Sequence, residues 1–366
     1  MSKASPQQIP VVVLAGFLGS GKTTLLNHLL HRSGGTRIGA IVNDFGSIEI
    51  DAMAVAGQLG DSTVALGNGC LCCAVDASEL DVYLDKLTRP VNDMHAIDVI
   101  VIEASGIAEP QELVRMVLAS DNPRIVYGGL IEVVDTAEFD ATREKHPEVE
   151  RHLGIADLVV VNKGDRVGPD ERERVLGVVR AAAGRAAVVS ASYGRIDPAL
   201  LFDCRPTEER IGQLSFDDLH KHDDHGGDDE HAAHDGHLHA AYDSVAFTSE
   251  VPMDPRRLIA FLDSRPEGLY RIKGYVDFGA GDRDNRYAVH AVGRFLRFYP
   301  EPWPSGEERL TQLVLIGSGI DATALGKQLD AAKSDAPHAV DEQGMWGVLR
   351  YVQDKGEAEE VADYVL

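Results

Sequence analysis

At residues 16–23 the chain reads Gly-Phe-Leu-Gly-Ser-Gly-Lys-Thr, directly after the apolar run Val11–Leu14 and directly before a helical stretch. This is the G-x-x-x-x-G-K-[ST] pattern in the strand–loop–helix setting of a phosphate-binding loop, and that setting disfavours an ordinary glycine-rich turn. Backbone N–H groups can point at a polyphosphate, Lys22 can reach its terminal groups, and the Thr23 hydroxyl suits Mg²⁺. The predicted nucleotide contacts in this loop are Gly16, Gly19, Ser20, Gly21, Lys22, Thr23 and Thr24.

A second motif predicts that the base is guanine. The apolar run Leu158–Val161 leads directly into Asn162-Lys163-Gly164-Asp165. The Asp165 carboxylate can accept hydrogen bonds from the ring N–H and the exocyclic amine of guanine, which adenine does not offer together. We expect Asn162 to brace the loop, Lys163 to lie along the base, and the backbone near Ser190 to add contacts. The tetrapeptide alone is also common in turns, but its place after a strand and downstream of a phosphate loop makes it specific.

Two polar segments lie between these motifs. The apolar run Val99–Glu103 delivers a carboxylate and is followed by Gly106, which is the layout of a second magnesium and γ-phosphate motif. We expect Glu103 to act with Lys22 in catalysis and with Thr23 in holding Mg²⁺. Asp44, after the second strand, is placed as a first switch and a further catalytic contact to Mg²⁺ or water, but a turn residue before Gly46 is an equal alternative.

The region from Pro10 to about Phe202 alternates β-branched runs with amphipathic helical stretches, which predicts a doubly wound, mostly parallel α/β sheet with helices on both faces. The strands are predicted at Val11–Leu14, Ile38–Asn43, Ile97–Glu103, Ile125–Asp135, Leu158–Asn162 and Ala187–Ser190. The helices are predicted at Lys22–Arg32, Ala77–Leu87, Pro110–Ala119 and Asp170–Ala183.

The segment from about Asp217 to Asp243 is rich in His, Asp and Gly and poor in large apolar residues, which predicts a flexible linker. Beyond it, a different pattern predicts a smaller α+β domain. The chain is therefore divided into residues 1–205, a linker at 206–243, and residues 244–366. The second domain is predicted to contain strands at Ser244–Ser249, Tyr270–Phe278, Tyr287–Tyr299, Gln312–Ile316 and Met345–Val352, with helices at Pro255–Asp263 and Ala322–Ala332.

Three of the four cysteines, Cys70, Cys72 and Cys73, follow a glycine-rich stretch within four residues. Thiolates so close together can converge on one soft or borderline cation such as Zn²⁺ or Co²⁺, with water or another side chain as a fourth ligand. Packing of one or two of these cysteines in a core is the alternative. Cys204 stands alone and is predicted to serve packing or the linker.

Seven histidines lie among acidic residues in the predicted linker, and neutral imidazole suits Zn, Ni, Co and Cu. A solvated spacer is the alternative, but the density of histidine favours weak metal capture. These residues are His220, His222, His225, His231, His234, His237 and His239.

The composition opposes several classes of partner. With 35 Lys+Arg against 59 Asp+Glu, the formal net charge is −24, which disfavours nucleic acid and anionic lipid. No apolar run is long enough to cross a bilayer, and residues 1–10 lack the pattern of a secretory signal, so we expect a cytoplasmic protein.

Together these motifs resemble the CobW-like family of metal-chaperone GTPases, which is related to the urease and hydrogenase maturation GTPases. The motifs occur in the family's order, and Arg271-Ile-Lys-Gly274 and Leu315-Ile-Gly317 look like its C-terminal domain. The resemblance implies GTP hydrolysis linked to delivery of zinc or cobalt to a client metalloprotein, with Cys70, Cys72 and Cys73 as the internal metal site. Many relatives have Glu where this chain has Ser47.

Two other classes of function are weighed against this prediction. A P-loop kinase or small-molecule transferase would need an acceptor pocket and would have no use for the cysteine loop. A metal-storage protein with a vestigial nucleotide site would not keep Lys22, Thr23, Glu103 and Asp165 together. The metal, the client and the oligomeric state are not specified by the sequence.

Overall fold

The computed structural model describes residues 8–33, 35–42, 77–89, 97–203, 242–336 and 343–352. The predicted metal-binding cysteines, Asp44 and the seven linker histidines lie outside these ranges. No helix in these ranges is long and apolar enough to cross a membrane.

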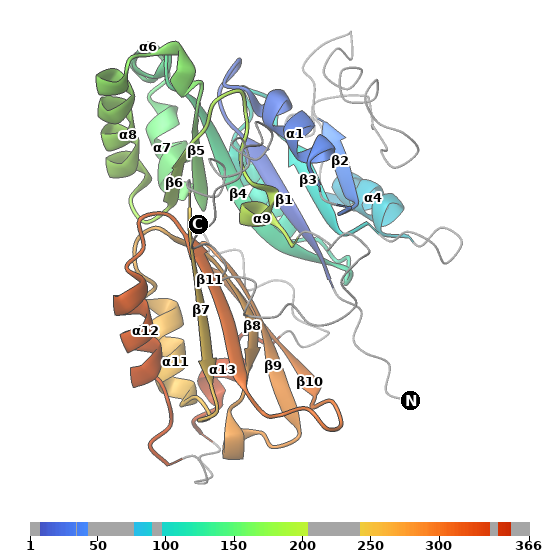
Figure 1. Cartoon of the computed structure of the whole chain (residues 1–366). Helices are drawn as coiled ribbons and strands as arrows, with labels where there is room; N and C mark the ends of the chain where they lie inside the picture. The colour runs from blue at the N-terminus through green and yellow to red at the C-terminus, as the bar shows by residue number, and fades with distance from the viewer. Residues whose placement is uncertain are drawn as a thin grey trace, which may run out of the picture.

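Six strands among the described residues form a parallel sheet in the order β2-β3-β1-β4-β5-β6 (Figure 1). Their bounds are β1 Ile9–Ala15, β2 Ile38–Val42, β3 Val99–Glu103, β4 Ile125–Asp135, β5 Leu158–Asn162 and β6 Ala187–Ser190. All six run in one direction, so their carboxyl ends meet at one edge, where the motif residues follow them. The predicted parallel α/β fold is confirmed.

Helices cover both faces of this sheet, and their bounds are α1 Lys22–His31, α4 Ala77–Thr88, α5 Pro110–Leu118, α6 Phe139–Lys145, α7 Glu148–Ile155, α8 Pro169–Ala183 and α9 Pro198–Leu201. Alternate residues of β1 point to opposite faces. Leu14 packs in the core beneath α1 and α9, while Val13 packs in the core beneath α4 and α5. Helices α7 and α8 cover β5 on the same face of the sheet as α4 and α5. The sequence prediction did not include α6, α7 and α9.

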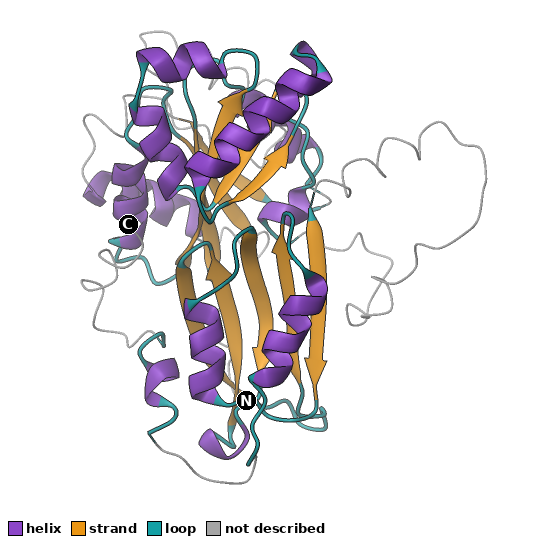
Figure 2. Ribbon diagram, turned by 90° about the vertical axis from the view of Figure 1, so that its left-hand side faces the viewer, coloured by secondary structure: helices purple, strands orange, loops and turns teal. Residues whose placement is uncertain are grey.

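A second sheet of five antiparallel strands has the order β10-β9-β8-β11-β7. Its strands are β7 Asp243–Ser249, β8 Leu269–Val276, β9 Asn285–Val292, β10 Phe295–Pro302 and β11 Thr311–Gly317. Helices α11 (Pro255–Asp263), α12 (Ala322–Ala331) and α13 (Trp346–Leu349) pack on one face of it around a shared apolar core (Figure 2). This is the predicted α+β arrangement.

Two predicted strands of the second domain are wrong. The single strand at Tyr287–Tyr299 is a hairpin, because Gly293 adopts a φ of 52° and turns the chain between β9 and β10. The apolar residues on both sides of Gly293 concealed this turn. The predicted strand at Met345–Val352 instead contains the helix α13, since Met345 and Val348 enter the core with the spacing of a helix, and only Val352 forms a bridge to β10.

The two sheets are joined by buried polar contacts. The Asp157 carboxylate, just before β5, accepts hydrogen bonds from the Tyr127 hydroxyl (2.5 Å) and the Leu130 amide (2.9 Å) within the first sheet, and from the backbone of Arg294 in the turn between β9 and β10. The ring of His290 in β9 lies with its Nε2 atom 2.8 Å from the Tyr127 carbonyl oxygen. Burial lowers the pKa of His290 to about 4, so this histidine is a neutral contact between the sheets.

Apolar side chains and the ends of the predicted linker strengthen this junction. Tyr270 and Val292 of the second sheet belong to the core cluster beneath α1. Asp203, the last described residue before the undescribed segment, forms ion pairs with Arg271 and Lys273 of β8. After that segment, the Tyr242 hydroxyl donates to Asp197 (3.0 Å) and Asp243 begins β7, so the predicted linker ends earlier than residue 243.

We expect Gly293→Ala to destabilise this junction. A methyl group at Gly293 would lie 1.5 Å from Asp157 Oδ1, so the sheets must shift to admit it. The matched control is Gly306→Ala, because Gly306 also has a positive φ (85°) but has no atom within 4 Å of such a methyl group. Gly293→Ala should lower the free energy of unfolding by about 1–3 kcal/mol more than the control, as measured by urea denaturation. Equal losses would show that the contact with Asp157 is unimportant.

Candidate functional site

The phosphate loop connects β1 to α1 at the carboxyl edge of the parallel sheet. Gly16, Gly19 and Gly21 have φ values of 142°, 78° and 105°, so they adopt the conformations that this loop requires. The first turn of α1 has no side-chain hydrogen bond capping it and includes no acidic residue. A helix start of this kind favours a bound anion.

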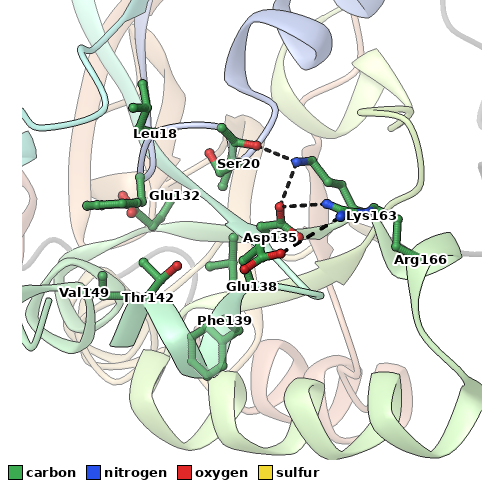
Figure 3. Close-up of a pocket in the computed structure, with 14 residues that line it drawn as sticks. Leu18, Ser20, Glu132, Asp135, Glu138, Phe139, Thr142, Val149, Lys163 and Arg166 are labelled. Carbon is green, nitrogen blue, oxygen red and sulfur yellow. Dashed lines mark hydrogen bonds and ion pairs between the residues drawn. The ribbon is translucent and has the colours of Figure 1, made fainter. Parts of the chain in front are cut away.

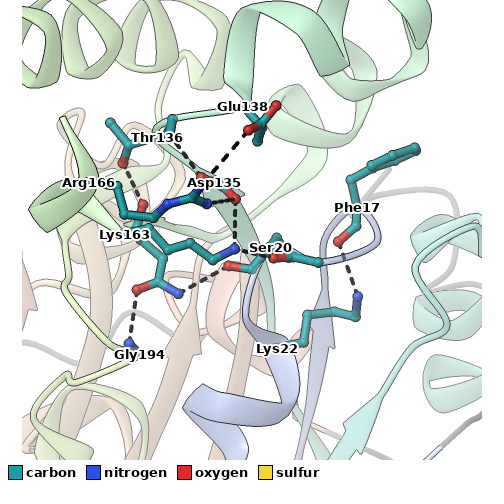
Figure 4. Close-up of polar contacts among 12 residues, drawn as sticks. Phe17, Ser20, Lys22, Asp135, Thr136, Glu138, Lys163, Arg166 and Gly194 are labelled. Carbon is teal, nitrogen blue, oxygen red and sulfur yellow. Dashed lines mark hydrogen bonds and ion pairs between the residues drawn. The ribbon is translucent and has the colours of Figure 1, made fainter.

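The Lys22 ammonium lies folded over this loop. Its Nζ donates to the carbonyl oxygens of Gly16 (2.9 Å) and Phe17 (3.3 Å), and the residue is 6% exposed (Figure 4). These contacts hold the positive charge of Lys22 beside the first residues of the phosphate loop. The predicted role of Lys22 at the terminal phosphates fits this position.

Thr23 and Glu103 meet across the edge of the sheet. The Thr23 hydroxyl donates to Glu103 Oε1 at 2.7 Å, and Glu103 is buried at the end of β3, which is adjacent to β1. A hydroxyl and a carboxylate are hard oxygen donors of the kind that Mg²⁺ prefers. The residues therefore fit the predicted magnesium ion.

The segment after β3 closely approaches the phosphate loop. A methyl group at Gly106 would lie 2.7 Å from both the Cα and the backbone nitrogen of Leu18, so only glycine fits there without displacement. The neighbouring side chains Leu18 and Ile107 are 75% and 60% exposed. Gly106 is thus positioned for the predicted contact near the terminal phosphate.

The predicted base-reading loop is bound directly to the phosphate loop. The Asn162 Nδ2 atom donates to the Ser20 carbonyl oxygen (3.0 Å), and Asn162 Oδ1 accepts from the Gly194 amide (2.9 Å). The Lys163 ammonium donates to the Gly19 carbonyl oxygen (2.5 Å) and to Asp135 Oδ2 (2.7 Å) (Figure 4). These contacts fix the position of the predicted base-reading loop relative to the phosphate loop.

Asp165 lies in the short turn η1 (Gly164–Arg166) with an exposed side chain, as a carboxylate that reads an incoming base should. The Ala191 amide, next to Ser190 at the end of β6, donates to the Val161 carbonyl oxygen (2.8 Å), and the Gly164 amide donates to the Ala191 carbonyl oxygen (3.3 Å). The backbone near Ser190 and the Asp165 turn therefore lie side by side.

Sequence reasoning missed three residues of this site, which are Asp135, Thr136 and Gly194. Asp135 is the register partner of Asn162 in the β4–β5 pair and also lies 3.5 Å from an Arg166 nitrogen. The Thr136 hydroxyl and amide both donate to the Asn162 carbonyl oxygen. The available signal was that Asp135 ends a predicted strand, as Glu103 does.

A pocket of about 240 Å³ lies behind the phosphate loop (Figure 3). Its walls are residues 17–20 of the loop, the end of β4, the start of α6, Val149 of α7, and Lys163 and Arg166. One wall residue, Glu132, is a buried carboxylic acid that the sequence analysis did not single out.

The predicted transition-metal site is not part of this geometry. Cys70, Cys72, Cys73 and Asp44, like the histidines from His220 to His239, fall outside the described ranges. Within those ranges, no group of three or more His, Cys, Asp or Glu residues is arranged to hold a metal ion.

The sequence matches two known protein domains, one over each of the two sheets. Residues 10–190 match the CobW/HypB/UreG nucleotide-binding domain, and residues 242–333 match the cobalamin synthesis protein cobW C-terminal domain. The zinc chaperone CobW of a Sinorhizobium species is 30% identical over 348 residues, which cover 86% of this chain and 94% of that protein. The zinc chaperone CobW of Pseudomonas aeruginosa is 31% identical over 363 residues, which cover 89% of this chain and 92% of that protein.

Among solved structures, the Zn(II)-bound YjiA GTPase from E. coli is 22% identical to this chain, with a TM-score of 0.40. The aligned region covers 90% of this chain and 100% of the YjiA chain. The family assignment rests on the sequence matches, which extend over both sheets and nearly the whole length of the two CobW relatives. On these matches, the chain belongs to the CobW/HypB/UreG family of nucleotide-binding proteins and carries that family's CobW C-terminal domain.

Proposed function

We propose that this protein is a cytoplasmic, GTP-hydrolysing metallochaperone that carries zinc, or cobalt or a similar transition metal, to a client metalloprotein. The observation that carries the nucleotide part is the pair of hydrogen bonds made by the Asn162 side chain, which donates to Ser20 of the phosphate loop and accepts from Gly194 of the loop after β6. The names of the CobW relatives as zinc chaperones support the metal part.

Each residue of the nucleotide site has a distinct task in this proposal. The Asp165 carboxylate accepts two hydrogen bonds from guanine, while the stem of Lys163 lies along the base and its ammonium stays anchored at Gly19 and Asp135. The loop amides and the start of α1 hold the phosphates. The Lys22 ammonium neutralises charge that develops on the terminal phosphate during attack by water.

Magnesium would be held by the Thr23 hydroxyl and the Glu103 carboxylate, and when bound it supplies further positive charge to the phosphate oxygens. The Gly106 amide, which lies against the phosphate loop, can donate to the terminal phosphate. In this proposal Asp44 is a further contact to Mg²⁺ or to the attacking water. GTP is the substrate, and GDP and phosphate are the products.

The cargo site is proposed at Cys70, Cys72 and Cys73, with the histidines between His220 and His239 as weaker ligands that collect metal. In the sequence, the cysteines lie between Asp44 and the strand β3 that ends in Glu103. A change in the contacts of the terminal phosphate can therefore reach the cysteine segment from both of its ends. This connection would make metal binding depend on the nucleotide.

We predict that Zn²⁺ affinity differs between the GTP and GDP states by about 5- to 150-fold, the usual range for coupled sites. The measurement is a zinc titration against a competing chelator in the apo, GDP and non-hydrolysable GTP states, under reducing conditions at fixed Mg²⁺. Cys72→Ser should weaken zinc binding and the coupling, because a serine hydroxyl is a poor ligand for this ion. Cys204→Ser is the matched control and should change neither.

Two results would contradict parts of this proposal. Three superimposable wild-type titrations would leave a nucleotide site and a metal site without an energetic connection, and the chaperone proposal would fail. An unchanged titration for Cys72→Ser would remove the cysteines from the cargo site.

A further inference from the structure

Glu132 is a buried carboxylic acid beside the phosphate loop. It lies in β4, opposite Ala15 at the end of β1 and three residues before Asp135. Glu132 is 2% exposed, and its Oε2 atom has no hydrogen-bond partner among the described residues. Burial of an ionised carboxylate without a partner is strongly unfavourable, so such a group is retained either as a neutral acid or for a charge that it meets.

The surroundings of Glu132 connect it to the nucleotide site. It lines the pocket behind residues 17–20, and Figure 3 shows it beside Leu18 and Ser20 of the phosphate loop. The Ser20 hydroxyl, which is also buried, has no hydrogen-bond partner in the described part of the chain. Two buried polar groups that lack a hydrogen-bond partner among the described residues thus line the same pocket at the phosphate loop.

Among the described residues, both positive and negative side chains lie near Glu132. Lys22 is the cation whose charge acts on it, while Asp135, Glu138, Lys163 and Arg166 line the remainder of the pocket. On this face, α7 carries the titratable His152, whose Nε2 atom lies 3.4 Å from Glu109 Oε2, and the elements that pack against β4 otherwise contribute apolar side chains. These are Ala15 of β1, Leu113, Val114 and Val117 of α5, and Val149 of α7.

Burial raises the pKa of Glu132 to about 8, although the Lys22 ammonium acts to lower it. At neutral pH the group is therefore mainly a neutral acid, and the charge of Lys22 is not cancelled by it. Above pH 8 the ionised carboxylate would become a buried counter-charge to the same ammonium.

We propose that Glu132 is a positioning residue of the phosphate loop, which in its neutral form leaves the Lys22 charge available to the nucleotide phosphates and in its ionised form competes with them. The proposal rests on the proposed nucleotide site. It assigns Glu132 no contact with the reacting atoms, because its effect passes through Lys22 and the loop.

Thermodynamic linkage gives this role a specific signature. Bound phosphates place negative charge near Glu132, and this charge favours the protonated form of the carboxyl group. At any pH at which Glu132 is ionised in the nucleotide-free protein, nucleotide binding is therefore accompanied by uptake of a proton. The affinity for nucleotide should then fall as pH rises above about 8, by up to tenfold per pH unit for one linked proton.

The experiment measures the dissociation constant of GDP with Mg²⁺ from pH 7 to 9.5 for the wild type, Glu132→Gln and Glu138→Gln. Glutamine keeps the shape of Glu132 but does not titrate, so this variant should lack the additional fall above pH 8. Glu138 lines the same pocket with an exposed side chain, so Glu138→Gln should keep the wild-type slope. Ionisation of the guanine ring affects all three proteins equally and cancels in the comparison.

Calorimetry of the wild type in two buffers with different ionisation enthalpies gives a second test that needs no variant. Proton uptake on binding of GDP at pH 8.5 is expected. The same pH profile for the wild type and Glu132→Gln, or an absence of proton uptake, would overturn the role of Glu132 and leave the nucleotide site standing. An absence of GDP binding at every pH would remove the nucleotide site and this proposal with it.

Discussion

Lys22→Ala is expected to hydrolyse GTP at least about 100-fold more slowly than the wild type, since removal of one group that stabilises transition-state charge commonly reduces rates by 10²–10³. The Lys22 ammonium is buried and held over the phosphate loop by the carbonyl oxygens of Gly16 and Phe17, so the substitution removes a fixed positive charge from the loop. The measurement is phosphate release at saturating GTP and Mg²⁺.

Lys327→Ala, an exposed lysine of α12 in the second sheet's domain, is the control for loss of a lysine and should keep the wild-type rate. Circular dichroism of both variants checks that the fold is intact. A rate for Lys22→Ala equal to that of the wild type would mean that the turnover arises outside this loop.

Asp165→Asn should reduce the preference for GTP over ATP by at least about 100-fold, because sites that hydrogen-bond a substrate group reject its analogues by 10⁴–10⁵ and the variant removes the charged acceptor. The variant should also gain affinity for xanthine nucleotides. Xanthine has a carbonyl group where guanine has its amine, and the asparagine amide can donate to it. Competition binding with GTP, ATP and XTP measures both changes.

Asp170→Asn is the matched control, because Asp170 is an exposed aspartate in the first turn of α8, five residues from Asp165. It should leave nucleotide preference unchanged. Equal affinity of the wild type for GTP and ATP would contradict the assignment of the base-reading loop.

The sequence predicted those parts of the site that are set by local pattern. Glu103 and Asn162 end their strands, and Lys22 and Thr23 begin the helix that follows the loop after β1. The carboxyl ends of the strands of a parallel sheet share one edge. The structure brings Thr23 to Glu103 and Asn162 to the phosphate loop, as those motifs require.

The missed residues depend on which strands are neighbours. Asp135 faces Asn162 only because β4 pairs with β5 in that register, and no local pattern specifies this order. Glu132 was hidden in an apolar run, since a strand covered by helices shows no alternation that would mark an inward polar residue. The hairpin at Gly293 was missed for a related reason, because β9 and β10 both carry apolar residues up to the turn.

The junction between the sheets determines how the chain can be divided. Tyr270, Val292 and Ile316 of the second sheet complete the core beneath α1, and Phe295 completes the core beneath α5. Either half expressed alone would expose these apolar surfaces and would leave Asp157 and His290 without the opposite sheet. We therefore expect the two halves to unfold together as one cooperative unit, although two separate sequence families match them.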